Sequence, residues 1–233
     1  MYMTSVIQSP YSNEQITVWL RGLLTVAWID GDFDKEEQKL IASLTQKEIA
    51  PQIDLGSVEP ITPEELAAAF ASDDEGAENF LRTAVLVALA DGIYSYSEDK
   101  LLYKFASALG KEAIALEALR HTLYQHPDTE PEQRSTALNI SELSAKGQRA
   151  LLQPVQHWLD GLEIQDPQVA RFLGKLIPSQ CPFERDIELF GHKIVHIPPL
   201  CKLNPLYEQL VGLRFRALSY LADDCGEDVS QYF

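Results

Sequence analysis

The sequence of 233 residues lacks several patterns that would point to a known chemistry. It has only three cysteines and no Cys-x-x-Cys pair, which excludes the usual paired-cysteine zinc sites. Its longest strictly apolar run is 84–90, far shorter than a membrane-spanning helix. No phosphate-binding glycine loop, Gly-x-Ser-x-Gly elbow, His-Glu-x-x-His sequence or dinucleotide fingerprint is present. We therefore expect a protein that is not an enzyme.

Basic residues are also scarce. The chain has 19 Lys and Arg against 35 Asp and Glu, a net charge of −16, whereas nucleic-acid binding needs a basic surface. Residues 1–142 hold 24 acids and 10 bases, and 143–233 hold 11 acids and 9 bases. This asymmetry predicts two domains, the first suited to cations or a basic protein surface. The first residues have no basic or apolar stretch of a signal peptide, so we expect a cytoplasmic protein.

One stretch of the chain occurs twice. Residues 20–41 and 81–102 are identical at nine of 22 positions when they are aligned at a constant offset of 61. Each copy has an apolar pattern with helical spacing, an Asp-Gly turn, an aromatic residue and an acidic start to a second helix. Gly31 is placed to end the first helix, because glycine adopts left-handed backbone angles at little cost. Such a repeat is typical of one supersecondary unit used twice and packed on itself.

The acids near each Asp-Gly turn have two interpretations. Asp34 and Ser95 each precede a glutamate by three residues, which is the spacing of a helix capping box. Alternatively, carboxylates at alternate positions of a tight turn bind a divalent cation, calcium or magnesium, although the spacing is not that of an EF-hand. The candidate metal ligands are Asp30, Asp32, Asp34 and Glu37 first, and Asp91 and Glu98 second.

The segments around the two Asp-Gly turns are 28–37 (WIDGDFDKEE) and 89–98 (LADGIYSYSE). With them, residues 12–125 resemble the tellurite-resistance TerB-like family. The resemblance implies a compact all-α domain of two helix–Asp-Gly–helix units, with an acidic, metal-binding surface and a role in stress physiology. Ser95 departs from the acidic pattern of the family, so the first turn is expected to carry most of any cation site.

Further signals organise the rest of the first half. Thr62-Pro63-Glu64-Glu65 predicts the start of a short helix, because threonine caps and proline fits the first helical position. The apolar run 84–90 predicts the most buried helix of the domain. After Gly110 and a last helix at 113–124, the chain becomes polar and has no clear period. We therefore interpret 126–147 as an interdomain linker.

The second half is also expected to be helical. An Asp-Pro pair gives a strong start signal for one of its helices, and Pro198, Pro199 and Pro205 favour an extended segment over 193–204. No alternating strand pattern is found, so the predicted fold class is all-α throughout. The helices are predicted over 151–162, 166–176, 182–191 and 206–221.

Three short sequence motifs in this half are unusual: 181–185 (CPFER), 197–205 (IPPLCKLNP) and 213–218 (LRFRAL). With them, residues 148–233 resemble the domain called the Mo-dependent nitrogenase C-terminal domain, which is known chiefly from cyanobacteria. The resemblance implies a small helical domain whose role is unassigned. Nitrogenase chemistry is not expected, because the chain has neither a P-loop nor a cysteine set for iron–sulfur clusters.

Two other groups of residues in the second half are candidates for a binding site. The first is a transition-metal site, but the wide spacing of its candidates favours ordinary buried thiols instead. The second is a docking face for an anionic membrane or a protein, over which ordinary packing and surface charge are favoured. The metal candidates are Cys181, Cys201, Cys225, His192 and His196. The bases of the docking face are Lys193, Lys202, Arg214 and Arg216.

These observations predict a soluble protein that binds rather than catalyses. The leading hypothesis is a divalent-cation-binding or cation-responsive adaptor, in which neutralised carboxylates fix a turn and so the angle between two helices. The alternative is a metal-free helical scaffold for protein–protein interaction, with peripheral membrane docking through 148–233 less favoured. The expected partner is another protein, and nucleic acid is not expected.

Overall fold

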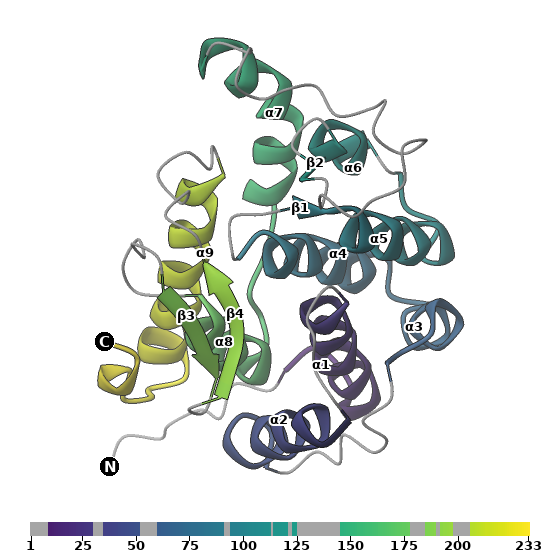
Figure 1. Cartoon of the computed structure of the whole chain (residues 1–233). Helices are drawn as coiled ribbons and strands as arrows, with labels where there is room; N and C mark the ends of the chain where they lie inside the picture. The colour runs from purple at the N-terminus through teal and green to yellow at the C-terminus, as the bar shows by residue number, and fades with distance from the viewer. Residues whose placement is uncertain are drawn as a thin grey trace.

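The computed structural model describes residues 9–29, 35–51, 60–90, 94–112, 114–120, 123–124, 145–177, 185–189, 192–197 and 206–233. Within these ranges the protein is all-α, with nine helices and four short strands (Figure 1). The helices are α1 (Asn13–Trp28), α2 (Lys35–Glu48), α3 (Pro63–Ala69), α4 (Asp74–Ala88), α5 (Tyr96–Ala108), α6 (Ile114–Leu119), α7 (Ala145–Asp160), α8 (Pro167–Leu176) and α9 (Tyr207–Ser219). The strands are β1 (Tyr94–Ser95), β2 (Leu123–Tyr124), β3 (Arg185–Leu189) and β4 (His192–Ile197).

Local capping signals determine where several helices start. Thr62 and Ser95 form the predicted capping boxes with the glutamates three residues later, and Ser12 forms one with Gln15 at the start of α1. The start of α4 lies 61 residues after that of α1, and the start of α5 lies 61 residues after that of α2. The helices therefore begin at the offset of the sequence repeat.

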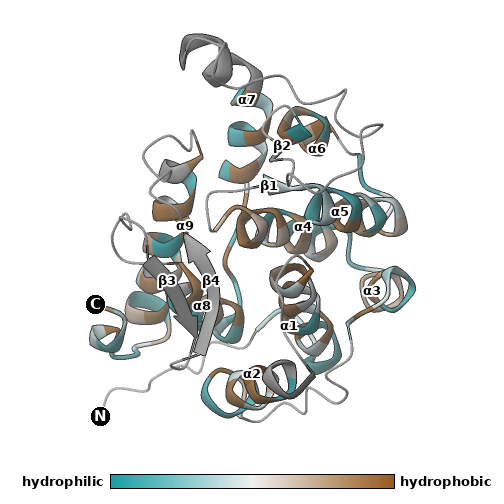
Figure 2. Ribbon diagram, viewed as in Figure 1, coloured by the Kyte–Doolittle hydropathy of each residue, from teal (hydrophilic) through white to brown (hydrophobic). Residues whose placement is uncertain are grey.

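Helix α4 lies at the centre of the first half, as its apolar sequence predicts. Every residue from Ala84 to Leu89 is buried, and Figure 2 shows the apolar colouring of this helix facing its neighbours. The ring of Phe80, on α4, packs against three other rings with centroids about 6 Å apart, in the tilted and edge-on arrangements that aromatic pairs prefer. These rings are those of Trp19, Phe70 and Phe105. This cluster joins α1 to α4 and α5.

The hydrophobic core continues into the second half. Leu152 on α7 and Phe172 on α8 belong to the same cluster of buried side chains as Trp19 and Phe80. Helix α8 lies between α1 and α9 in the fold (Figure 1). Helix α7 begins within the segment predicted as linker, 126–147, and the preceding part of that segment lies outside the described ranges.

The helix predicted over 182–191 is wrong. Residues Arg185–Leu189 form β3, which pairs antiparallel with β4 in a hairpin. Apolar Ile187 and Leu189 alternate with polar neighbours, and β4 is rich in β-branched residues, both of which favour strands. The alternation is too short to stand out in the sequence. The prediction of an extended chain after Lys193 is confirmed as far as Ile197.

Candidate functional site

Most of the predicted cation ligands lie outside the described residues. This is the case for Asp30, Asp32, Asp34 and Asp91, and Glu37 lies on α2 with its side chain outside the description. In the part of the chain that the structure describes, no three His, Cys, Asp or Glu side chains gather in a way that would hold a metal ion. The cation site therefore stays a prediction.

Glu98 is the one predicted ligand whose side chain is described, and it acts as a helix cap. Its Oε2 accepts hydrogen bonds from the backbone N–H and the hydroxyl of Ser95, both at 2.8 Å. The Ser95 Oγ in turn accepts from the Glu98 N–H at 3.2 Å. The Glu98 side chain is buried, so this reciprocal cap fixes the start of α5.

Among the Cys and His candidates of the second half, Cys225 alone has a described side chain. It is a partly exposed free thiol, and burial is the main cause that raises its pKa. His192 and His196 lie on strand β4, so the one-turn spacing of a helix does not apply to them. Cys181 and Cys201 lie outside the described residues. The proposed transition-metal set is therefore not tested.

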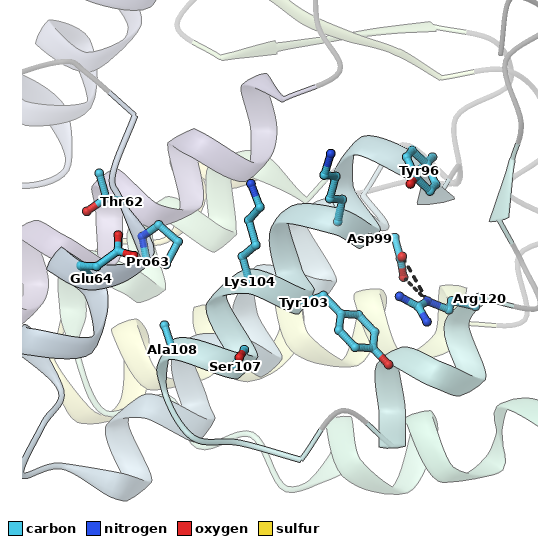
Figure 3. A pocket seen from close by; sticks show the side chains of 11 residues that line it. Thr62, Pro63, Glu64, Tyr96, Asp99, Tyr103, Lys104, Ser107, Ala108 and Arg120 are labelled. Atoms are coloured by element: carbon cyan, nitrogen blue, oxygen red, sulfur yellow. Dashed lines mark hydrogen bonds and ion pairs between the residues drawn. The ribbon is translucent and has the colours of Figure 1, made fainter. Parts of the chain in front are cut away.

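A groove of about 820 Å³ runs along α5, between α3 and the end of α6. Figure 3 shows Lys104 in the middle of the groove, with residues of α3 on one side and Arg120 on the other. The side chains from α5 recur at intervals of three or four residues, so they form one face of that helix. The lining residues are Thr62, Pro63, Glu64, Tyr96, Asp99, Lys100, Tyr103, Lys104, Ser107, Ala108 and Arg120.

A buried ion pair lies at one side of the groove. Asp99 is only 2% exposed, and both of its carboxylate oxygens accept from Nε of Arg120, at 3.2 and 3.1 Å. The hydroxyl of Tyr94, on β1, donates to Asp99 Oδ1 at 3.2 Å. Burial raises the pKa of Asp99, and the attraction of Arg120 offsets only part of that effect. The carboxylate thus holds the Arg120 side chain in place, and both of its oxygens already accept hydrogen bonds.

The Arg120 guanidinium is further held by an aromatic ring. It lies 4.0 Å from the centre of the Tyr103 ring, a cation–π contact, and the Tyr103 hydroxyl donates to the carboxylate of Glu117. Arg120 contacts Asp99 through Nε, and its Nη1 lies 3.6 Å from the Glu117 carboxylate, in a longer ion pair. Arg120 therefore contributes an ordered cation to the groove.

Two lysines contribute exposed positive charge to the groove. Lys100 and Lys104 are both exposed, and neither forms a hydrogen bond or ion pair with another described residue. They lie one helical turn apart on α5, which places their Cβ atoms about 6 Å from each other. Tyr96, 43% exposed, precedes them on the same face. The groove thus combines cationic groups with tyrosine rings.

These groups are suited to binding. The described lining includes no histidine or cysteine, and the one buried carboxylate is occupied by Arg120 and Tyr94. Sequence reasoning missed the groove, although Tyr96, Lys100 and Lys104 do follow one helix face in the sequence. The walls come from α3 and α6, which only the tertiary structure brings to α5.

The bases assigned to a docking face in the second half include two that are structural. The Arg214 guanidinium is buried and donates to the carbonyl oxygens of Gly174, Ile177 and Tyr232. Arg216 donates to the carbonyl oxygen of Leu162 at 3.0 Å. The prediction of a surface charge is therefore wrong for Arg214, whereas Arg216 is half-buried and uses part of its guanidinium to hold this carbonyl. None of the described helices has the length and apolar character to cross a membrane.

Burial also changes the electrostatics of these two arginines. It is the main cause that lowers the pKa of each, and the charge of Asp160 offsets only part of that effect at Arg216. Lys193 and Lys202, the other bases of the predicted face, have side chains outside the description.

Comparison with known proteins relates one part of the chain to a family. Residues 151–233 match the family described as Mo-dependent nitrogenase C-terminus. This match confirms the resemblance predicted for the C-terminal part of the chain, and the groove along α5 lies outside it. The comparisons with curated proteins and with solved structures find no match. The TerB-like resemblance of 12–125 stays a prediction.

Proposed function

We propose that this protein is a non-enzymatic interaction scaffold that binds a partner protein in the groove along α5. The observation that carries the proposal is the groove itself, an open site of about 820 Å³ in which exposed lysines and tyrosines surround a fixed arginine. Its length along α5, from Tyr96 to Ala108, is about 18 Å at 1.5 Å per residue, enough for a short peptide segment.

The support beneath the groove favours recognition without rearrangement. Helix α5 is anchored by the buried side chains of Leu102 and Phe105, and its start is fixed by the Ser95–Glu98 cap. Arg120 is held by Asp99 and by the Tyr103 ring. A site on rigid elements loses little conformational entropy when it binds, which favours affinity from a few contacts.

A peptide-display experiment tests this proposal. A library of random 12-residue peptides is selected on the full-length protein, and each enriched peptide is then measured against two variants. Ser107→Trp places an indole in the groove, and Ser43→Trp places one on the exposed side of α2 as the matched control. We expect peptides that bind the wild type and the control but not Ser107→Trp. Failure to enrich any peptide with this dependence contradicts the proposal.

A cation-responsive form of the same scaffold is the second candidate, and one contact favours it. The chain enters β1 directly from the second Asp-Gly turn, and Tyr94 of β1 donates to Asp99, which holds Arg120 in the groove. Calcium or magnesium held mainly by Asp30 and Asp32 of the first turn, with Asp91 of the second turn as a further ligand, would thereby act on the groove through Tyr94. The TerB-like resemblance supports such a role in stress physiology.

Calorimetric titration tests the cation. Calcium and then magnesium are titrated into chelator-stripped protein, into Asp30→Asn/Asp32→Asn, and into the control Asp223→Asn/Asp224→Asn, which changes two exposed acids in the π-helical turn Tyr220–Asp224 after α9. Saturable binding at micromolar concentration that only the first variant loses supports a true site. Absence of binding at millimolar cation leaves the acids as helix caps.

A further inference from the structure

The groove along α5 is a basic site in a strongly acidic region. Residues 1–142 contain 24 acids and only 10 bases, yet Lys100, Lys104 and Arg120 all line this one groove. Other bases of the region are engaged elsewhere: Arg82 and Lys111, for example, form ion pairs with acids of α4. The concentration of bases is therefore local to the groove.

The acids around the groove pair with Arg120 and not with the two lysines. Asp99 is buried and paired with Arg120, and Glu117, which accepts from Tyr103, forms a second ion pair with Arg120. Glu64 is the exposed acid of the lining, and it lies at the start of α3. No ion pair with a described residue involves Lys100 or Lys104, so their ammonium groups are available to a ligand.

We infer that the segment bound in the groove is acidic, and that two of its carboxylates pair with Lys100 and Lys104. This inference rests on the proposed function. The two lysines, one turn apart, match acids four residues apart in a helix or two apart in an extended peptide, since both spacings are about 6–7 Å. Tyr96, whose side chain is exposed, supplies a ring face for an apolar residue beside those acids.

The surroundings favour an acidic peptide over other anionic macromolecules. A nucleic acid would meet a chain of net charge −16, whose repulsion opposes a polyanion of high charge density. A bilayer surface would need exposed apolar side chains to insert, and the groove has only tyrosines and short side chains beside its bases. A short acidic segment reaches the bases without bringing a large opposing charge.

Fluorescence anisotropy with synthetic peptides tests the inference on the full-length protein. One labelled 12-residue helical peptide carries two glutamates four residues apart beside a leucine, and matched peptides carry glutamine or lysine at those positions. Each is titrated into the wild type, into Lys100→Gln/Lys104→Gln, and into Lys39→Gln/Lys47→Gln. The last variant removes two exposed lysines of α2 and makes the same change in net charge.

We expect the glutamate peptide to bind the wild type and the α2 control equally and to lose about tenfold in affinity for the groove variant. Its binding should also weaken as salt rises from 50 to about 300 mM, because the charges that pair are exposed. Equal binding of the glutamate and glutamine peptides, or equal loss in both lysine variants, overturns the inference. Peptides from the display selection that depend on Ser107 and yet are neutral or basic also overturn it. The proposed function would stand in that case.

Discussion

Arg82 and Gly161 join the two halves of the chain, although 79 residues separate them in the sequence. Arg82 Nη1 donates to the Gly161 carbonyl oxygen at 2.9 Å, and the guanidinium lies 5.8 Å from the centre of the Trp158 ring. The Trp158 indole N–H donates to Glu78, which like Arg82 belongs to α4. Helix α4 of the repeat and helix α7, most of which lies in the family match, are thus linked by polar contacts as well as by the shared core.

Replacing Arg82 by alanine is expected to lower the free energy of unfolding by about 2 kcal/mol. The substitution removes the hydrogen bonds to Asn79 and Gly161, the ion pair with Glu78 and the packing of the guanidinium on the Trp158 ring. Urea denaturation followed by circular dichroism measures the change. Lys47→Ala, at an exposed position of α2, is the control and should change the value by less than about 0.5 kcal/mol. Equal effects of the two variants would contradict the role given to Arg82.

The same substitution, glycine to alanine, should have opposite effects in two helices. A Cβ at Gly22 of α1 would lie 2.6 Å from Cε2 of Phe80, whose ring is fully buried in the aromatic cluster. Gly22→Ala should therefore destabilise the protein by about 1–3 kcal/mol. A Cβ at Gly212 of α9 would meet no atom within 4 Å, so Gly212→Ala should stabilise it by about 0.5–1 kcal/mol through helix propensity. Thermal unfolding of both variants measures the two signs, and a shared sign would refute this account of Gly22.

Local signals in the sequence were enough to predict much of the fold. The capping boxes at Thr62 and Ser95 form as predicted, because side chain and backbone groups three residues apart are sufficient to specify them. The apolar run 84–90 identifies α4 because its residues cover every side of the helix, and those from Ala84 to Leu89 are buried. The β3–β4 hairpin could not be recognised in the same way, because its strands alternate over too few residues to be distinguished from a helix.

The candidate site depends on tertiary contacts, which leave little local pattern. Lys100 and Lys104 can be placed on one helix face from sequence, but Arg120 joins them in the lining of the groove through contacts with Asp99 and Tyr103 that no local pattern shows. Arg214 is a similar case: its sequence context indicates surface charge, and its burial is compensated by carbonyl oxygens from distant residues. Every residue has a backbone carbonyl oxygen whatever its side chain, so no sequence motif shows which carbonyls will accept from a buried arginine.

Loss of the Arg214 guanidinium should destabilise the C-terminal part strongly. Its hydrogen bonds join the end of α8, at Gly174 and Ile177, to the carbonyl of Tyr232 beside the chain end. We expect Arg214→Leu to cost about 3 kcal/mol or more, because buried acceptors lose their charged donor. Arg214→Lys should restore only part of that, since one ammonium lacks the planar fork that reaches separate acceptors. Urea denaturation compares the two, and a lysine variant as stable as the wild type would contradict the fork argument.

The pH dependence of stability should reveal the buried carboxylate of Asp166. Burial is the main cause that raises the pKa of Asp166, although it caps α8 by accepting from the Val169 N–H at 2.9 Å. An acid whose folded pKa is raised makes the folded state less stable as pH rises from its unfolded pKa, near 3.9, to the folded value. Asp166→Asn keeps a cap but does not ionise. Its stability relative to wild type should therefore be constant below about pH 4, increase through the raised pKa and level off above it.

Asp228 supplies the control of opposite sign for that experiment. Its carboxylate is exposed and accepts from the Ser230 N–H at 2.9 Å, and this hydrogen bond is the main cause that lowers its pKa. A lowered folded pKa adds stability that is present above the unfolded pKa and lost as pH falls below it. The stability of Asp228→Asn relative to wild type should therefore decrease as pH rises toward about 4 and stay constant above. Urea denaturation from pH 3 to about 7 measures both curves, and parallel curves for the two variants would show that burial does not govern Asp166.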